Sequence, residues 1–212
     1  MKEFRENEVD QLVISLQQVD AKMTDTLMYC ADFLGIPREK VHVISHMESF
    51  VYYVLSQKKD LWTNQVGLFD LSNQRLCYYE MKVQRGLRRN MVQADSENME
   101  EAFNLDILDS PSGSRLADRI LCSCGERLLS KKLFSSIFLT GKGFDRTDWA
   151  GEFMKLVCHR KKVFAEPVLF ARGAAYKGAD CRQSATSYPY IFICEGRLKT
   201  EVSMRVVRGQ KE

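Results

Sequence analysis

The first 57 residues alternate between two kinds of hydrophobic pattern. Residues 11–19 (QLVISLQQV) and 41–45 (VHVIS) are short apolar runs with β-branched residues, which are typical of strands. After each run, apolar side chains recur three or four positions apart, which indicates one face of a helix. These positions are Met23, Leu27, Cys30, Ala31 and Leu34, and then Met47, Phe50, Val51, Val54 and Leu55. The pattern predicts a β-α-β-α order, with Gly35 and Pro37 ending the first helix.

A second series of elements follows a polar linker at residues 58–64. Residues 66–71 (VGLFDL) and 75–83 (RLCYYEMKV) have the pattern of strands, and the short turn 72–74 between them predicts a hairpin. We expect a third strand at 87–94 and then a loop at 95–113 with one helical turn. Farther along, the pattern predicts helix, strand, helix, strand and helix at 116–128, 133–140, 149–157, 162–165 and 168–179.

The order from residue 66 onward is that of an RNase-H-like fold, a meander followed by parallel strands joined through right-handed helical crossovers. We therefore predict an α/β fold with a mixed five-stranded sheet and helices on both faces. Two further strands, at 190–194 and 200–207, close the chain. The expected units are 1–57, the β-α-β-α part; 58–187, the RNase-H-like part; and 188–212, the C-terminal strand pair.

Composition narrows the class of protein. Of the 212 residues, 45% are hydrophobic, enough for a sizeable core, and 31 Lys and Arg nearly balance 28 Asp and Glu. A net charge of +3 does not indicate a nucleic-acid surface, so binding through Arg85, Arg88 and Arg89 ranks last among our hypotheses. Apolar runs such as 50–55 are far shorter than the about 20 residues of a membrane-spanning helix. We expect no membrane span, and nucleic acid is an unlikely partner.

Cysteine usage points to a reduced compartment. The seven cysteines are an odd number scattered through apolar segments, unlike a disulfide framework, which favours a cytoplasmic location. Cys122 and Cys124 form a CxC pair, but no second pair stands at zinc spacing. We therefore predict no metal site of this kind.

Four segments, in this order, resemble those of the actin, Hsp70 and hexokinase superfamily, in which two RNase-H-like halves enclose a nucleotide. GLFDLSNQRLCYYEM resembles the second phosphate-binding hairpin, and SIFLTGKGFDRTDW resembles the Gly-rich turn at the adenosine. AEPVLFARGAAYKGA resembles the helix that follows, and VISHMESFVYYVL the helix that crosses between the halves. The chain is also similar to a bacterial domain family of unassigned function.

The resemblance implies a set of candidate residues and a cofactor, ATP with Mg²⁺. Asp70 would be the catalytic candidate at the hairpin, and Glu48 a second one near the start of the crossing helix. Asp70 has an alternative interpretation as a strand-end residue that bonds its own turn, and Gly173 one as a close helix-on-sheet contact. The nucleotide-binding candidates are Ser72, Asn73, Gly141, Lys142, Gly143 and Gly173.

Two departures from the superfamily change the functional expectation. Its phosphate hairpin uses glycines that let backbone N–H groups approach phosphate, whereas this turn is Ser72-Asn73-Gln74. His46 also stands where an acidic residue often positions the attacking water. In addition, the β-α-β-α start matches only the closing portion of a first half, so we expect the first meander and phosphate loop to lie upstream of Met1.

We therefore expect a degenerate actin-like module that acts by binding and conformational contact and is inactive alone. Its partners would be the absent N-terminal segment, another protein, or a second copy through the sheet edges at 11–17 and 41–45. The alternative is part of a genuine ATP-hydrolysing protein whose first phosphate loop lies upstream.

Overall fold

The computed structural model describes residues 9–72, 75–86, 89–99, 103–159 and 161–194. Two strands and two helices form the N-terminal part: β1 (Leu12–Leu16), α1 (Ala21–Phe33), β2 (Val41–Ser45) and α2 (His46–Leu55). The strands that follow are β3 (Gln65–Asp70), β4 (Cys77–Gln84), β5 (Met91–Asn98), β6 (Phe134–Thr140), β7 (Lys162–Ala165) and β8 (Ile191–Ile193). The later helices are α3 (Pro111–Leu129), α4 (Gly151–Cys158) and α5 (Leu169–Cys181).

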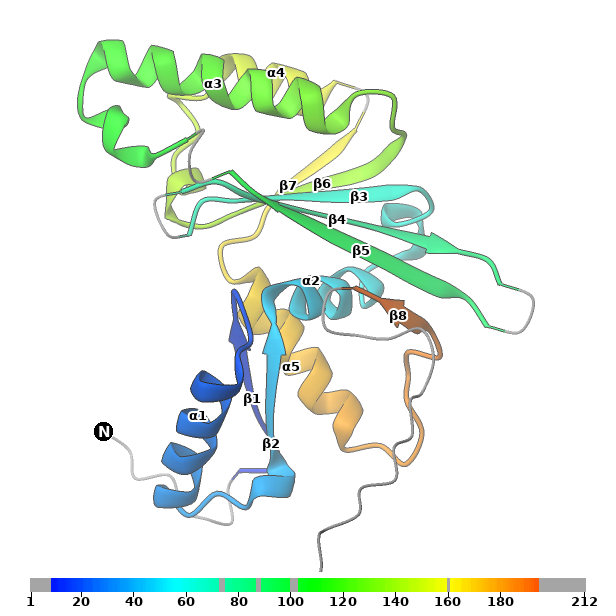
Figure 1. The fold of residues 1–212 in the computed structure, drawn as a ribbon. Helices are drawn as coiled ribbons and strands as arrows, with labels where there is room; N and C mark the ends of the chain where they lie inside the picture. The colour runs from blue at the N-terminus through cyan, green and yellow to red at the C-terminus, as the bar shows by residue number, and fades with distance from the viewer. Residues whose placement is uncertain (1–8, 73–74, 87–88, 100–102, 160, 195–212) are drawn as a thin grey trace, which may run out of the picture.

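The strands after α2 form one sheet in the order β7-β6-β3-β4-β5-β8 (Figure 1). β3, β4 and β5 make an antiparallel meander, and β6 and β7 are added parallel on the β3 side. This is the RNase-H-like order that the sequence predicts. The prediction of five strands is wrong, because β8 pairs parallel with the outer edge of β5 and makes a sixth. The second C-terminal strand, predicted at 200–207, lies outside the described residues.

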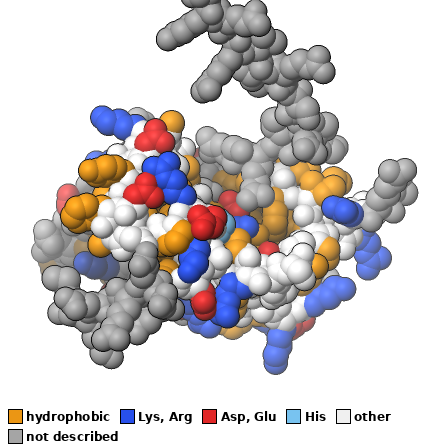
Figure 2. Space-filling model, turned by 90° about the horizontal axis from the view of Figure 1, so that it is seen from below, with side chains coloured by type: hydrophobic (Ala, Val, Ile, Leu, Met, Phe, Trp, Pro, Cys, Tyr) orange, Lys and Arg blue, Asp and Glu red, His pale blue; other side chains and the backbone are white. Residues whose placement is uncertain are grey.

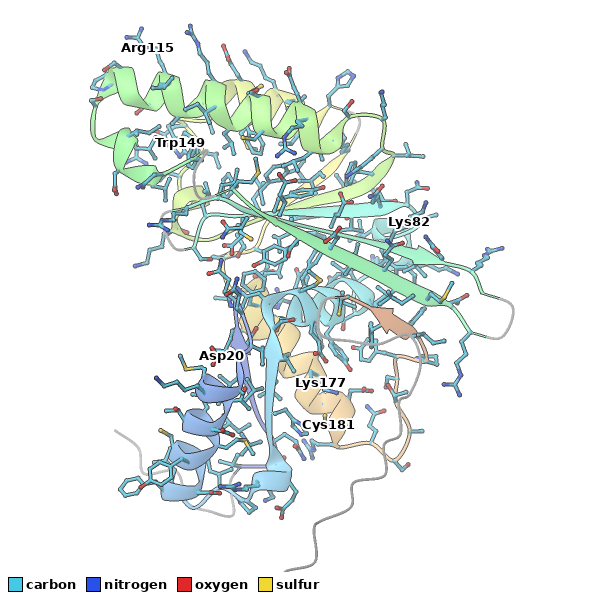
Figure 3. All side chains as sticks on the ribbon, viewed as in Figure 1. Asp20, Lys82, Arg115, Trp149, Lys177 and Cys181 are labelled. Atoms are coloured by element: carbon cyan, nitrogen blue, oxygen red, sulfur yellow. The ribbon has the colours of Figure 1, made fainter. Side chains whose placement is uncertain are left out.

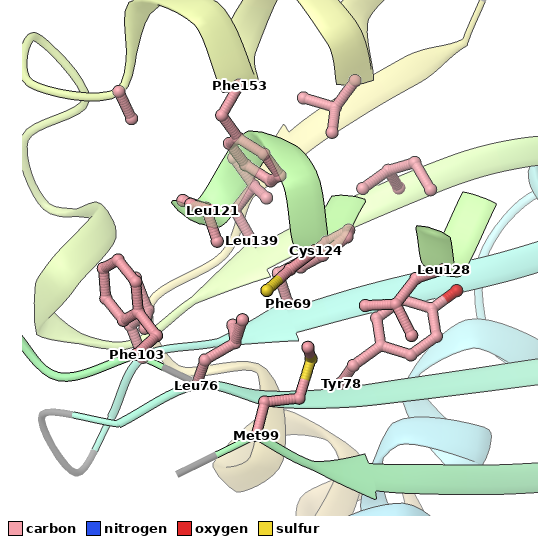
Figure 4. Packing of buried hydrophobic residues seen from close by; sticks show 14 of the residues in the cluster. Phe69, Leu76, Tyr78, Met99, Phe103, Leu121, Cys124, Leu128, Leu139 and Phe153 are labelled. Carbon is pink, nitrogen blue, oxygen red and sulfur yellow. The ribbon is translucent and has the colours of Figure 1, made fainter. Parts of the chain in front are cut away.

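Helices cover both faces of this sheet, as predicted. α3 and α4 lie on one face and α2 and α5 on the other (Figure 1). Successive residues of β3 point to opposite faces of the sheet. Phe69 belongs to the core between the sheet and α3 and α4, whereas Leu68 belongs to the core between the sheet and α2. In the first core, the rings of Phe69 and Phe153 meet edge to face with centroids 5.0 Å apart (Figure 4). The two cores hold the ends of β3 and β6, where the candidate residues lie, in fixed positions.

The predicted loop at 95–113 is partly wrong. β5 runs on to Asn98, which pairs with Cys77 of β4, and α3 already begins at Pro111. The hydrophobic pattern gave no sign of this part of the strand, because residues 95–98 (DSEN) are polar and all four are exposed. Ser110 caps α3 by accepting a hydrogen bond from the Gly113 N–H, and proline is favoured at the first helical position. Only a short 3₁₀ helix, Leu105–Asp109, remains from the helical turn that we expected there.

The N-terminal β-α-β-α order is also as predicted. β1 and β2 pair in parallel as a separate two-stranded sheet. α1 buries less than its apolar spacing indicated, because only Ala31 of this helix is fully buried, while Phe33 is 83% exposed. Figure 2 shows hydrophobic side chains exposed beside charged ones on the lower face, the end at which α1 lies in Figure 1.

α2 ties the N-terminal part to the larger sheet. Although our division places it in the unit 1–57, eight of its ten residues are buried, and it packs beside α5 on the face of the six-stranded sheet. Lys177 of α5 (Figure 3) donates a 3.3 Å hydrogen bond to the Tyr52 hydroxyl of α2 and lies over its ring. Within the described residues, none of the helices is both long enough and apolar enough to cross a membrane.

Candidate functional site

Asp70 is the last residue of β3, and its carboxylate accepts hydrogen bonds from the turn that follows it. The side chain is 4% exposed and accepts hydrogen bonds from the Ser72 N–H, at 2.8 Å, and from the Ser72 hydroxyl. Burial raises the pKa of this carboxyl group, and the bonds from Ser72 oppose that shift. Of the two interpretations offered above, the geometry matches the strand-end residue that bonds its own turn.

The glycine turn after β6 lies directly against the Asp70 turn. Gly141 has φ +93°, and a Cβ atom there would come within 2.2 Å of the Ser72 backbone nitrogen. A Cβ atom on Gly143 would come within 2.7 Å of the Leu71 Cβ, and the Leu71 N–H donates to the Thr140 carbonyl at 2.9 Å. The backbone of one turn therefore fills the space beside the other.

The structure brings together only some of the predicted site residues. Asp70, Ser72, Gly141 and Gly143 meet at the paired turns, and Lys142 is exposed beside them. Asn73 lies outside the described residues. Glu48 lies in the first turn of α2, half-buried, where its N–H donates to the Ser45 hydroxyl at 3.1 Å.

Gly173 serves a close crossing of two helices. A Cβ atom at this position of α5 would lie 1.9 Å from the Ser49 carbonyl oxygen of α2. The packing explanation holds, with one correction: the contact is helix on helix and not helix on sheet. Ser49 itself is fully buried, and its hydroxyl is 2.6 Å from that of Ser15 on β1. This crossing joins α2, α5 and β1.

His46 occupies an apolar site at the start of α2. Its ring stacks on that of Phe170 with centroids 3.9 Å apart, and its buried Nδ1 has no hydrogen-bond partner among the residues that the structure describes. Burial lowers the pKa of His46 from 6.5 to about 4. The imidazole is therefore neutral at pH 7, and it packs as an aromatic ring.

Replacing His46 by phenylalanine should make the protein less sensitive to acid. The unfolded chain binds a proton at this histidine near its ordinary pKa of 6.5, whereas the folded chain does so only near 4. The histidine therefore lowers the free energy of unfolding as the pH falls from about 6.5 to 4. Urea titrations across this range should give a shallower decline for H46F than for the parent. An equal decline of the free energy of unfolding in the two proteins would contradict the lowered pKa of His46.

The sequence reasoning missed a polar cluster beside the glycine turn. Glu166, just after β7, accepts a 3.0 Å hydrogen bond from the Tyr53 hydroxyl and pairs with the Arg172 guanidinium. Its carbonyl accepts a 2.7 Å bond from the Thr140 hydroxyl. Burial, followed by contact with Glu166, raises the pKa of Tyr53 to about 12. The cluster fixes the start of α5 against β6, and its members are too far apart in the sequence to form a motif.

A cleft of about 500 Å³ lies between the two sheets, with residues 17–20 on one side and Cys77, Tyr79, Ser96 and Asn98 of β4 and β5 on the other. Among the described residues that line it, Asp20 is the only charged one, and the remainder are mainly Gln, Ser, Asn and apolar side chains. Asp20 caps α1 by accepting from the Met23 N–H at 2.8 Å (Figure 3). A triphosphate in this cleft would meet a carboxylate and no Lys or Arg among the lining residues.

A larger groove of about 760 Å³ runs along β1. One wall is residues 10–15, and the other is the side of α5 that carries Ala171, Ala174, Ala175, Gly178 and Ala179. The sequence reasoning also missed this groove, although alanines four residues apart in a helix were visible in the sequence.

Comparison with known proteins identifies the family. Residues 1–195 match a profile described as the C-terminal part of a family of unknown function, DUF5716. The chain belongs to this family. The resemblance to a domain family of unassigned function is thereby confirmed, whereas membership of the actin and Hsp70 superfamily is not shown. None of the curated proteins matches the chain.

Among solved structures, this DUF5716 chain is similar to the yeast mitochondrial Holliday junction resolvase. The two share 18% identity with a TM-score of 0.28, and the match covers 80% of this chain. The chain spans 64% of the length of the resolvase chain. The strand order β7-β6-β3-β4-β5-β8 is what defines the fold of this chain.

Proposed function

We propose that this chain is a degenerate actin-like module that acts by binding and conformational contact and does not turn over nucleotide. The observation that carries the proposal is the contact between the turns 70–72 and 141–143. In the resemblance stated above, these turns bind phosphate and adenosine. Here the Ser72 nitrogen lies only 2.2 Å from the place that a Cβ atom of Gly141 would take, so the turns leave no room between them for a phosphate group.

Charge supports the same proposal. Nucleotide sites stabilise phosphates with cationic side chains, backbone N–H groups or Mg²⁺. Within the described part of the chain, Asp20 is the only charged residue that lines the cleft between the sheets, and the Asp70 carboxylate accepts bonds from its own turn. The family description marks this region as C-terminal, which favours a preceding region of the family as one contact partner.

Isothermal titration with Mg-ATP of the full-length protein that contains this chain tests the proposal. We expect no saturable heat up to about 1 mM nucleotide, which corresponds to binding weaker than about 4 kcal/mol, and no release of phosphate. Micromolar binding together with steady phosphate release would overturn the proposal.

The second candidate is a genuine ATPase whose other catalytic parts precede this chain. The position of Asp70 favours it, because a buried carboxylate lies at the end of the central strand beside a glycine turn. In a longer protein that contains this chain and releases phosphate, Asp70→Ala should abolish the release and leave the fold intact. An unchanged rate would reject this role.

A further inference from the structure

The groove beside β1 is bounded by a strand edge. Successive residues of a strand point to opposite faces, so residues 10–15 can all line one groove only if it runs along the edge. Among the described residues β1 pairs with β2 alone, so its other edge faces this groove. An unpaired edge presents backbone N–H and C=O groups that can extend the sheet with another strand.

The opposite wall of the groove has room for such a strand. Ala171, Ala175 and Ala179 are exposed and follow one another at four-residue intervals along α5. The neighbouring Gly178 already packs over Val13 of β1, because a Cβ atom there would lie 3.2 Å from the Val13 Cγ2. A strand added to β1 would therefore lie against the small alanine side chains of α5.

The distribution of charge along the groove favours an added strand that carries no charged residue. Asp10 and Arg182 stand together at one end, where they form a 3.0 Å ion pair, and no other described residue that lines the groove is charged. β1 itself meets this requirement, since residues 11–18 (QLVISLQQ) contain no charged residue. The edge is therefore complementary to a second copy of itself.

We propose that two copies of this chain associate through the outer edges of β1, antiparallel, about a two-fold axis near Ile14. Leu12 of one copy then lies opposite Leu16 of the other, and the two small sheets become one of four strands. Asp10 falls opposite Gln18, so no like charges meet. The alanine side of each α5 faces the other helix across the axis, and small side chains allow two helices to approach closely. This inference rests on the proposed function, because it names the partner of a contact module.

Analytical ultracentrifugation of the intact chain and one variant tests the inference. The parent should sediment at twice its monomer mass of 24.5 kDa at about 100 μM protein. Ala175→Arg places an unpaired charge in the groove and should weaken association by at least about tenfold. Ala21→Arg makes the same change at another exposed helical alanine and should associate like the parent.

Hydrogen exchange gives a second readout that does not depend on a variant. Amides of residues 12–16 should exchange more slowly at the concentration that gives dimers than at a monomeric dilution. The urea midpoints of Ala175→Arg and of the parent should be equal when both proteins are measured at the monomeric dilution, which would show that the variant is folded. A parent that stays monomeric, a dimer that survives Ala175→Arg, or β1 exchange that does not change with concentration would each overturn the inference. The Mg-ATP titration reports on the proposed function separately.

Discussion

Replacing Gly173 by alanine should destabilise the protein by about 3 kcal/mol, the upper range for an overpacked core. In the interior of a helix, alanine is ordinarily favoured over glycine by up to about 1 kcal/mol. Here the added methyl group would stand 1.9 Å from the Ser49 carbonyl oxygen, and the nearest atoms belong to backbone, which cannot rotate away. The clash therefore outweighs the gain in helix propensity, and α5 must separate from α2.

Urea unfolding of Gly173→Ala measures this cost, with Gly151→Ala as the matched control. Gly151 begins α4, and the nearest atom to an added Cβ is the Asp118 Oδ2 at 4.0 Å, an ordinary contact. The control should be neutral or slightly more stable than the parent. If Gly173→Ala were as stable as the control, α2 and α5 would not cross as closely as described.

The sequence predicted most elements because their hydrophobic periods are local. The strands at 41–45, 133–140 and 162–165 and the helices around them lie within a few residues of their predicted places. The exceptions have physical reasons. The polar end of β5 is held in the sheet by pairing with β4. The strand predicted at 190–194 is present as β8, but its place in the six-stranded sheet depends on its pairing with β5. Neither pairing has a local signal.

The candidate site was less predictable, because its properties depend on contacts between distant segments. The sequence placed Asp70 and Gly141 at the ends of two strands, and the parallel pairing of β3 with β6 brings these ends together. It did not indicate that the Ser72 nitrogen lies against Gly141, which decides whether phosphate has room. The same limit applies to Gly173 and Ser49, whose approach is visible only once α2 and α5 are placed together.

Replacing Gly141 by alanine should also cost about 3 kcal/mol or more, for two separate reasons. Gly141 has φ +93° and ψ 160°, a region open essentially to glycine alone, and forcing another residue into it costs about 1–3 kcal/mol. The added methyl group would also meet the Ser72 backbone nitrogen at 2.2 Å. The Asp70 turn would have to move, which breaks the bond from the Leu71 N–H to the Thr140 carbonyl.

Chemical denaturation of Gly141→Ala beside Lys142→Ala measures this effect within one turn. Lys142 is the exposed neighbour, and its truncation should change the free energy of unfolding by no more than about 0.5 kcal/mol. A loss under about 1 kcal/mol for Gly141→Ala would be smaller than the strain alone. It would mean that the two turns stand apart, with space for a phosphate group between Asp70 and the glycine turn. The ATPase alternative would then gain the room that the proposed function denies it.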